Sequence, residues 1–153
     1  MADSPIKTQI MVALGEALEA ITELKTVNRY RGKPIDLDVV PLPALYFYDD
    51  NESRVRNNRL QNGVINLVMA VFMPIPVDDL GSQKFSDDAD IIQAKVHGIL
   101  FGSENLLPSL GVIMIQEEQV TKDYPNDEYG IVIIQNTLTY AHKFGDAFTT
   151  NTD

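Results

Sequence analysis

The sequence predicts an α+β fold in which a mainly antiparallel or mixed β-sheet packs against two α-helices. Two segments carry apolar residues at the three- and four-residue spacing of an amphipathic helix, and several others are short runs of β-branched and aromatic residues. The order helix, strands, helix, strands is typical of α+β domains. The chain of 153 residues has the length of one domain, and no linker or internal repeat divides it. We therefore expect residues 1–153 to form a single domain.

The first helix is predicted over residues 5–24. Ser4 and Pro5 form a start signal, because serine caps helices and proline fits the first helical turn. The other side of the helix is acidic, whereas helices that lie on membranes are usually basic, so we expect this helix to face a protein core. Its apolar stripe consists of Ile6, Ile10, Leu14, Ala17, Ile21 and Leu24.

Strand-like segments follow on both sides of a proline-rich connection. Residues 26–31 are a candidate for a short strand, and residues 44–48, with the aromatic sequence ALYFY, for a second one. Between them, residues 31–43 contain three prolines and a glycine, which predicts an irregular or extended connection. The polar residues 49–62 are predicted to form a loop or a hairpin tip.

The central strand of the sheet is predicted at residues 63–73. Its side chains form a nearly continuous apolar run of β-forming residues. Such a run is typical of a strand that is buried on both faces. Prolines at positions 74 and 76 end the run, and residues 75–86 are predicted to form a loop.

The second helix is predicted over residues 87–101. Ser86 is the expected cap, acidic residues follow in the first turn, and Gly102 is the expected stop. Two further strands are predicted at residues 112–118 and 129–142. A turn-rich segment joins them, so they should pair antiparallel. A flexible tail is expected from about residue 147.

The composition excludes several kinds of site and partner. The chain has no cysteine, so disulfides and thiolate metal sites are impossible. Its net charge is −10, and an acidic chain is on average repelled by nucleic-acid phosphate. The N-terminus lacks the pattern of a signal peptide, and the longest apolar run, residues 64–75, is too short to span a bilayer. We expect a soluble, unsecreted protein with no membrane partner.

Positive charge is concentrated in one part of the chain. Residues 25–59 hold seven of the twelve basic residues against five acidic ones, whereas residues 60–153 hold four basic and thirteen acidic ones. Segments of opposite charge can meet across a subunit boundary in a head-to-tail ring. The alternative is that both segments are solvated faces. The sequence leaves these two interpretations open.

No catalytic motif is recognisable. The patterns GxxxxGK[ST], GxGxxG, GxSxG and HExxH are all absent. His97 lies seven residues from Asp90 without an evident nucleophile, and both His97 and His142 are interpreted as structural. We predict a protein that is not an enzyme and that has no cofactor.

Pairs of adjacent carboxylates are present, but they are weak candidates for a metal site. Neighbouring residues of a helix or strand point in different directions, so each pair alone is a poor chelator. Solvated turns and helix caps explain them better, and we predict no metal site. The pairs are Asp49–Asp50, Asp78–Asp79, Asp87–Asp88 and Glu117–Glu118.

Arginine residues give the candidate interaction site. Arg54 and Arg56 would share one face of an extended segment, with Arg59 close behind them. Arginine favours carboxylate or phosphate partners and is enriched at protein interfaces. The polar segment that carries these residues either becomes ordered on a partner or is a solvated hairpin tip. We predict Arg29, Arg54, Arg56 and Arg59 as protein-interface residues.

The order of these segments resembles that of a known family. An N-terminal amphipathic helix leads through a short strand and a proline-rich segment to ALYFY, and a polar loop and the apolar strand GVINLVMAVF follow. The second helix contains DDADIIQAKVHGIL, and two strands lead to a Tyr-x-x-x-x-Gly-Asp ending, Tyr140 to Asp146. Over about residues 5–147 the chain resembles the tail-terminator and tail-completion proteins of tailed bacteriophages. The resemblance rests on length, element order and this short ending.

The resemblance implies a structural subunit of the virion, assembled in the host cytoplasm. Proteins of this family form a hexameric ring on the last ring of the tail tube, stop its polymerisation and offer a surface to the head side. The implied partners are other copies of the chain, the tail tube protein and the head–tail connector proteins. DNA would pass through the ring without specific contact. A head–tail connector or neck adaptor is the alternative role, and the resemblance transfers no site residue by position.

Overall fold

The fold consists of a mixed β-sheet with two α-helices, as the sequence predicts. The computed structural model describes residues 5–30, 32, 35–57, 60–75, 81–102, 111–124, 128–143 and 146–150. For residues 51–57, 60–62, 81–82, 102, 117–118, 142–143 and 146–150 it describes the backbone alone. The elements are α1 (Ile6–Leu18), β1 (Thr26–Arg29), β2 (Ala44–Asn57), β3 (Leu60–Pro74), α2 (Gly81–Gly102), β4 (Val112–Asp123), β5 (Tyr129–Lys143) and β6 (Asp146–Thr150).

The described part of the chain forms one six-stranded sheet with the strand order β1-β2-β3-β5-β4, and β6 pairs with β5. β1 runs parallel to β2, and all the other pairs are antiparallel, so the sheet is mixed. The predicted antiparallel pairing of the last two long strands, β4 and β5, is confirmed. β3 lies between β2 and β5, as expected of the central strand.

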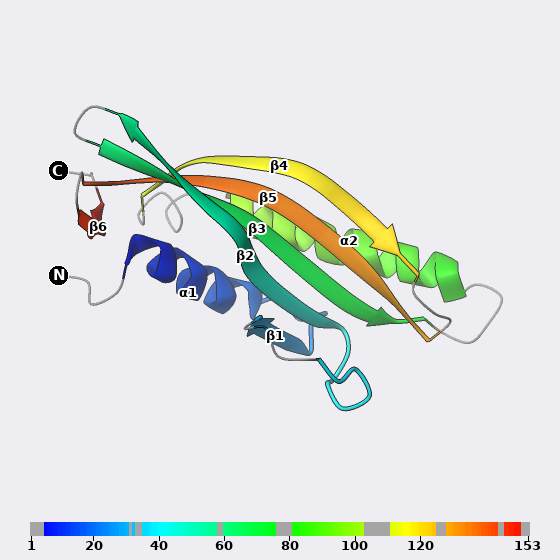
Figure 1. Ribbon diagram of the computed structural model, residues 1–153. Coiled ribbons are helices and arrows are strands. Elements are labelled where there is room, and N and C mark those ends of the chain that lie inside the picture. The colour runs from blue at the N-terminus through cyan, green and yellow to red at the C-terminus, as the bar shows by residue number, and fades with distance from the viewer. Residues whose placement is uncertain are drawn as a thin grey trace.

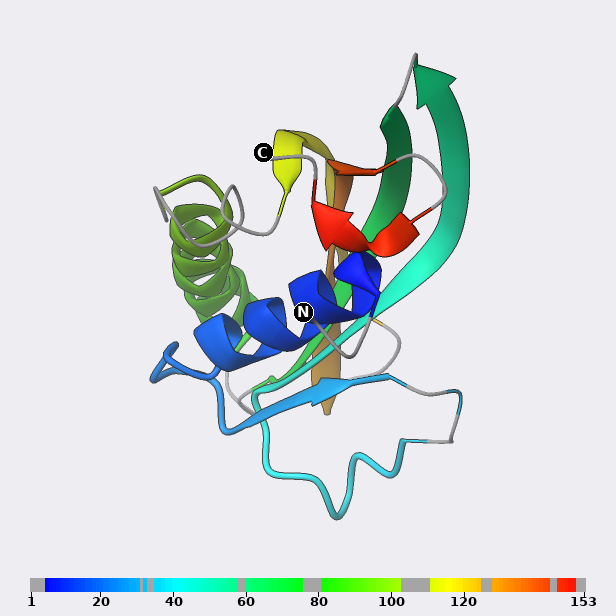
Figure 2. The same cartoon turned by 90° about the vertical axis from the view of Figure 1, so that its left-hand side faces the viewer.

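Both helices lie on the same side of the sheet. Figure 1 shows α1 and α2 behind or below the strands, and Figure 2 shows the same arrangement edge-on. We call the face toward the helices the inner face and the opposite one the outer face. In the described part of the chain, no helix covers the outer face.

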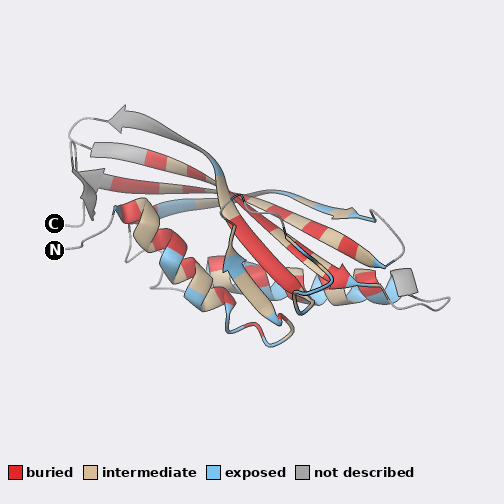
Figure 3. Cartoon of the chain, turned by 60° about the horizontal axis from the view of Figure 1, so that its bottom comes forward, coloured by how far each residue is buried: buried red, intermediate tan, exposed pale blue. Residues whose placement is uncertain are grey.

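The strand β3 alternates between these two faces. Its odd-numbered residues from Ile65 to Met73 point inward and are buried. Its even-numbered residues from Val64 to Phe72 point outward and are half-buried, except for Val68, which is 7% exposed. The alternation appears as red and tan bands along the strands in Figure 3. The prediction of burial on both faces is therefore wrong for most of β3, because the described helices cover only one face.

The helix α1 confirms the predicted stripe but is shorter than predicted. Its inward residues, among them Ile10 and Leu14, are completely buried. The helix ends at Leu18, whereas the sequence predicted residue 24. Ile21 and Leu24 nevertheless stay buried, because the irregular segment after the helix follows the same core.

The helix α2 begins earlier than predicted. It starts at Gly81, so Ser86 lies inside the helix and the predicted cap at this residue is wrong. The reason is that the apolar stripe of α2 extends back to Phe85, whose side chain is fully buried in the core. The Ser86 hydroxyl instead accepts a hydrogen bond from Lys122 Nζ of β4 at 2.8 Å.

Two glycines let large aromatic rings pack directly on the sheet. A Cβ atom on Gly63 would lie 2.2 Å from the ring of Tyr140, its partner on β5. A Cβ atom on Gly130 would lie 2.5 Å from the ring of Phe85. Both rings are buried, so neither has room to move away. These positions therefore require glycine for close approach.

The chain forms β-strand at two places where the sequence predicted none. Of the predicted loop 49–62, β2 takes the part up to Asn57 and β3 begins at Leu60, while residues 58–59 lie outside the described residues. A register shift between Asp49 and Glu52 marks a β-bulge, where the strand bends without ending. Near the C-terminus, where the sequence predicted no strand, β6 pairs with the end of β5.

Candidate interaction surfaces

The structure separates the predicted interface arginines. Arg29 is half-buried at the end of β1 and lies opposite Phe47 of β2. Arg54 lies on β2 seven residues beyond Phe47, which corresponds to about 20 Å along a strand. Arg54 and Arg56 occupy alternate positions of β2, and only their backbone is described. Arg59 lies outside the described residues.

The outer face of the sheet carries an uncharged strip along its three central strands. The chain has a net charge of −10, yet no residue of this strip is charged. Tyr46 and Phe72 pack edge to face across it, with ring centroids 6.0 Å apart. We call it the outer strip; it comprises Ala44, Tyr46 and Tyr48 of β2, Val64, Asn66, Val68, Ala70 and Phe72 of β3, and Ile131, Ile133, Gln135, Thr137 and Thr139 of β5.

The outer strip differs from a sheet face that is built to meet water. Antiparallel strands with one solvated face usually place polar residues outward. Here the half of the strip toward Phe72 and Ile131 is aliphatic and aromatic, while the half toward Thr137 and Thr139 is polar. On the neighbouring edge strand β4, outward residues such as Gln116 and Thr121 are polar and exposed. The apolar half of the strip is thus a candidate surface for another polypeptide.

A second apolar surface lies on α2, on the side away from the sheet. Ile91, Ala94, Gly98 and Phe101 follow one another at steps of three, four and three residues, so they line one side of the helix. Ile91 is 48% and Phe101 43% exposed, and a Cβ atom on Gly98 would meet nothing within 4 Å. We call these residues the outward α2 stripe. It lies opposite the buried stripe that packs against the sheet.

One groove runs beside the N-terminal half of α2. It has a volume of about 290 Å³. Its described lining combines a mainly apolar floor with three charged side chains and has no hydroxyl or imidazole group. The lining residues are Glu23, Lys25, Leu42, Pro43, Met73, Pro74, Asp88, Ile91 and Ile92.

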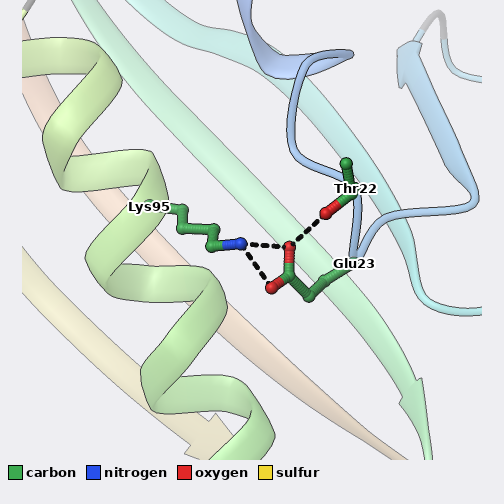
Figure 4. Close-up of polar contacts among 3 residues, drawn as sticks. All are labelled: Thr22, Glu23 and Lys95. Carbon is green, nitrogen blue, oxygen red and sulfur yellow. Dashed lines mark hydrogen bonds and ion pairs between the residues drawn. The ribbon is translucent and has the colours of Figure 1, made fainter.

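An ion pair at the wall of this groove ties α2 to the segment after α1 (Figure 4). Lys95 Nζ donates to Glu23 Oε1 at 2.6 Å and to Oε2 at 2.5 Å, and the Thr22 hydroxyl donates to Oε1 at 3.1 Å. The hydrogen bond from Lys95 holds the pKa of Glu23 below its usual value, although desolvation opposes this shift. The groups face solvent, so the contact fixes position more than it adds stability.

Other carboxylates pair with lysines or accept backbone hydrogen bonds, as Asp36 does from Asp38 N at 3.1 Å and Asp123 from Tyr124 N at 2.8 Å. Asp49 points inward and forms an ion pair with Lys7 of α1. Asp88 pairs with Lys84 at 3.4 Å. Within the described residues, no group of three or more potential metal ligands lies together. Of the predicted pairs, Asp78–Asp79 lies outside the described residues, and Glu117–Glu118 is described by its backbone alone.

The histidine considered as a possible base stacks on an aromatic ring instead. The ring of His97 lies 4.4 Å from that of Phe101 in a stacked arrangement, and the Asp90 carboxylate binds Lys122 Nζ at 2.7 Å. Below His97, a cavity of about 10 Å³ reaches the inner face of the sheet at Asn136, which is 2% exposed. This space is sufficient for at most one water molecule.

The described structure adds two surfaces that the sequence did not predict, an uncharged sheet face and an apolar helix stripe. The arginine interface stays a prediction. The signal for the sheet face was present in the apolar run 63–73, which was interpreted as burial within one chain. The signal for the stripe was the second set of apolar residues on α2, beginning at Ile91.

Comparison of the chain with protein-family models and with curated proteins found no match. Among the described residues, no helix is both long and apolar enough to cross a membrane. The assignment of a function therefore depends on these surfaces and on the order of the elements.

Proposed function

We propose that the chain is a non-enzymatic structural subunit of a bacteriophage virion, placed at the tail or neck. Copies of it form a ring, a hexamer by resemblance, at the head-proximal end of the tail tube. The ring ends tube polymerisation and provides the surface for head joining, with the tube protein and the connector proteins as partners.

The observation that carries this proposal is the outer strip. A sheet face that carries no charge, is apolar over one half and is covered by no described helix is typical of a subunit that buries this surface on assembly. The acidic charge of the chain supports a ring through which DNA passes without being held, because carboxylates do not bind phosphate. The order of helices and strands supports the virion role by its resemblance to tail-terminator proteins.

Particle mass and effect on tube growth test the proposal. Light scattering over a concentration series should reveal a species near 103 kDa, which is six times the 17.1 kDa of one chain, and negative stain should show rings with a central hole. Added to polymerising tube protein, the ring should stop growth at one tube end. Unchanged tube growth at saturating ring concentration would overturn the terminator role. Binding to portal or connector rings, and not to tubes, would favour the alternative, a head–tail connector or neck adaptor.

The arginine prediction requires its own test. The double variant Arg54→Glu with Arg56→Glu should fold normally and should assemble about tenfold more weakly, because two charges at an interface change sign. Lys84→Glu is a matched control, since Lys84 is exposed on α2. Sedimentation of both variants measures the effect. Equal assembly of the double variant and the control would remove the arginines from the interface.

A further inference from the structure

We infer that copies of the chain associate head to tail, with the outward α2 stripe of one copy packed on the outer strip of the next. This inference rests on the proposed function, because it names the contact that would build the proposed ring. A closed ring of more than two subunits needs two different surfaces that fit each other. The two apolar surfaces described above are such a pair.

The positions of the two surfaces prevent them from meeting within one copy. The outer strip lies on the sheet face that no described helix covers (Figure 2), and the outward α2 stripe lies on the side of α2 away from its buried residues, with Ile91 also lining the groove. Each copy therefore carries the outer strip on the sheet layer and the outward α2 stripe on the helix layer. When the stripe of one copy lies on the strip of another, the helix-on-sheet arrangement of the single domain is repeated between subunits.

The dimensions of the two surfaces agree. From Ile91 to Phe101 the helix rises about 15 Å. The strands β2, β3 and β5 span two interstrand spacings, about 10 Å, and the strip is longer than that along the strands. Ala94 and Gly98 in the middle of the stripe allow the helix backbone to approach the sheet closely. Ile91 and Phe101 at its two ends supply the large apolar side chains of the contact.

Charge favours this contact over others between copies. Two chains of net charge −10 repel each other, so association is cheapest where both surfaces are uncharged. The residues of the outer strip and the four residues of the outward α2 stripe are uncharged, and the exposed Asp87 and Lys95, each one turn from Ile91, border the stripe. A symmetrical contact between two outer strips would also be uncharged. It would, however, close at two copies and leave Ile91 and Phe101 exposed.

Single cysteines test the contact directly, because the natural chain has none. Gly98→Cys places a thiol on the stripe, and Ile133→Cys places one on the outer strip. In an equimolar mixture treated with a short bismaleimide, the mixed dimer should form at least about tenfold faster than either homodimer, since contact raises the effective thiol concentration to the millimolar range. The matched control is a mixture of Ile133→Cys with Val12→Cys, which places the thiol at an exposed position of α1.

Charged substitutions give a second, independent readout. Gly98→Glu blocks the stripe and Ile133→Glu blocks the strip, so each variant alone should be monomeric. An equimolar mixture should give a 1:1 dimer and nothing larger, because one intact stripe and one intact strip remain. Gln135→Glu is the milder replacement on the same strip if Ile133→Glu fails to fold. Light scattering measures all of these masses.

The outcomes separate this contact from the proposed function. Cross-linking no faster than the control, or homodimers of the Ile133→Cys protein as the main product, would overturn the contact. Rings that still cap tubes would then leave the proposed function standing. The expected mixed dimers, obtained with a protein that has no effect on tube growth, would establish the contact and reject the terminator role.

Discussion

The two faces of the sheet are made by the same strands but differ in how far their residues are buried. On the inner face, residues such as Met69 and Ile134 are covered by α1 and α2 and are almost completely buried. On the outer face, their neighbours Ala70 and Ile133 are apolar too but only half-buried, and no described helix covers them. The comparison teaches that the strands carry apolar residues on both faces, whereas the described helices cover one face only. Three residues of the outer strip, Ala44, Tyr46 and Val68, are nevertheless buried.

The largest expected effect is at the centre of the inner face. Leu14→Asp places a charge where α1 meets the sheet, at a site with 0% exposure. Burial of an unpaired carboxylate costs more than a domain of this size can lose, so we expect no cooperative unfolding transition. Val12→Asp, on the 53% exposed side of the same helix, should fold normally. Circular dichroism with thermal denaturation measures both. A folded Leu14→Asp protein would contradict the assignment of α1 to the core.

Two adjacent isoleucines compare the faces most directly. Ile134→Ala removes an inward side chain and should lower the free energy of unfolding by about 2–5 kcal/mol. Ile133→Ala removes the same groups from the outer strip and should cost the monomer only about 1 kcal/mol. Urea denaturation at low protein concentration measures these values. Ile133→Ala should weaken self-association more than Ile134→Ala does. Equal losses of stability would show that the outer face is covered within the monomer.

The sequence predicted the fold well where one periodicity controlled one element. The stripe of α1 and the inward half of the apolar run of β3 belong to the same core. The start of α2 was missed because Ser86 and the acidic residues after it resemble a cap, while Phe85 extends the buried stripe to an earlier turn. The long β2 was missed because its polar residues satisfy their backbone by pairing with β3, which composition does not reveal.

The candidate site was harder to predict than the fold. At an outward position such as Phe72, the sequence shows an apolar residue whether the surface that covers it belongs to the same chain or to another one. The sequence therefore supports burial but does not say by which chain. The close contact between Gly63 and the ring of Tyr140 could not be predicted from the sequence either, because it depends on the pairing of two strands that are distant in the sequence.

Two glycines extend the comparison to backbone positions. Gly63→Ala would push a methyl group into the buried ring of Tyr140, so we expect a loss of about 1–3 kcal/mol in the free energy of unfolding. Gly98→Ala adds the same group in open space on α2 and should stabilise the monomer by roughly 0.5–1 kcal/mol, because alanine is the better helix former. Tyr140→Leu combined with Gly63→Ala should lose less than the sum of the single changes. Additive losses would mean that the ring and Gly63 do not touch.

The smallest expected effect concerns the solvent-facing ion pair between Glu23 and Lys95. The pKa of Glu23 is lowered by the hydrogen bond from Lys95, so its carboxylate stabilises the folded chain above the unfolded pKa of glutamate, which is about 4.3. That contribution disappears as the pH falls through the still lower pKa of the folded state. Wild type should therefore melt slightly above Glu23→Gln at pH 7, and the difference should shrink as the pH falls below the unfolded pKa of glutamate. Glu19→Gln on the exposed end of α1 is the control, and its melting point should track wild type across this pH range. A difference between wild type and Glu23→Gln that stays the same from pH 7 down to the lowest pH at which both proteins fold would mean that Glu23 acts through packing beside α2 and not through its charge.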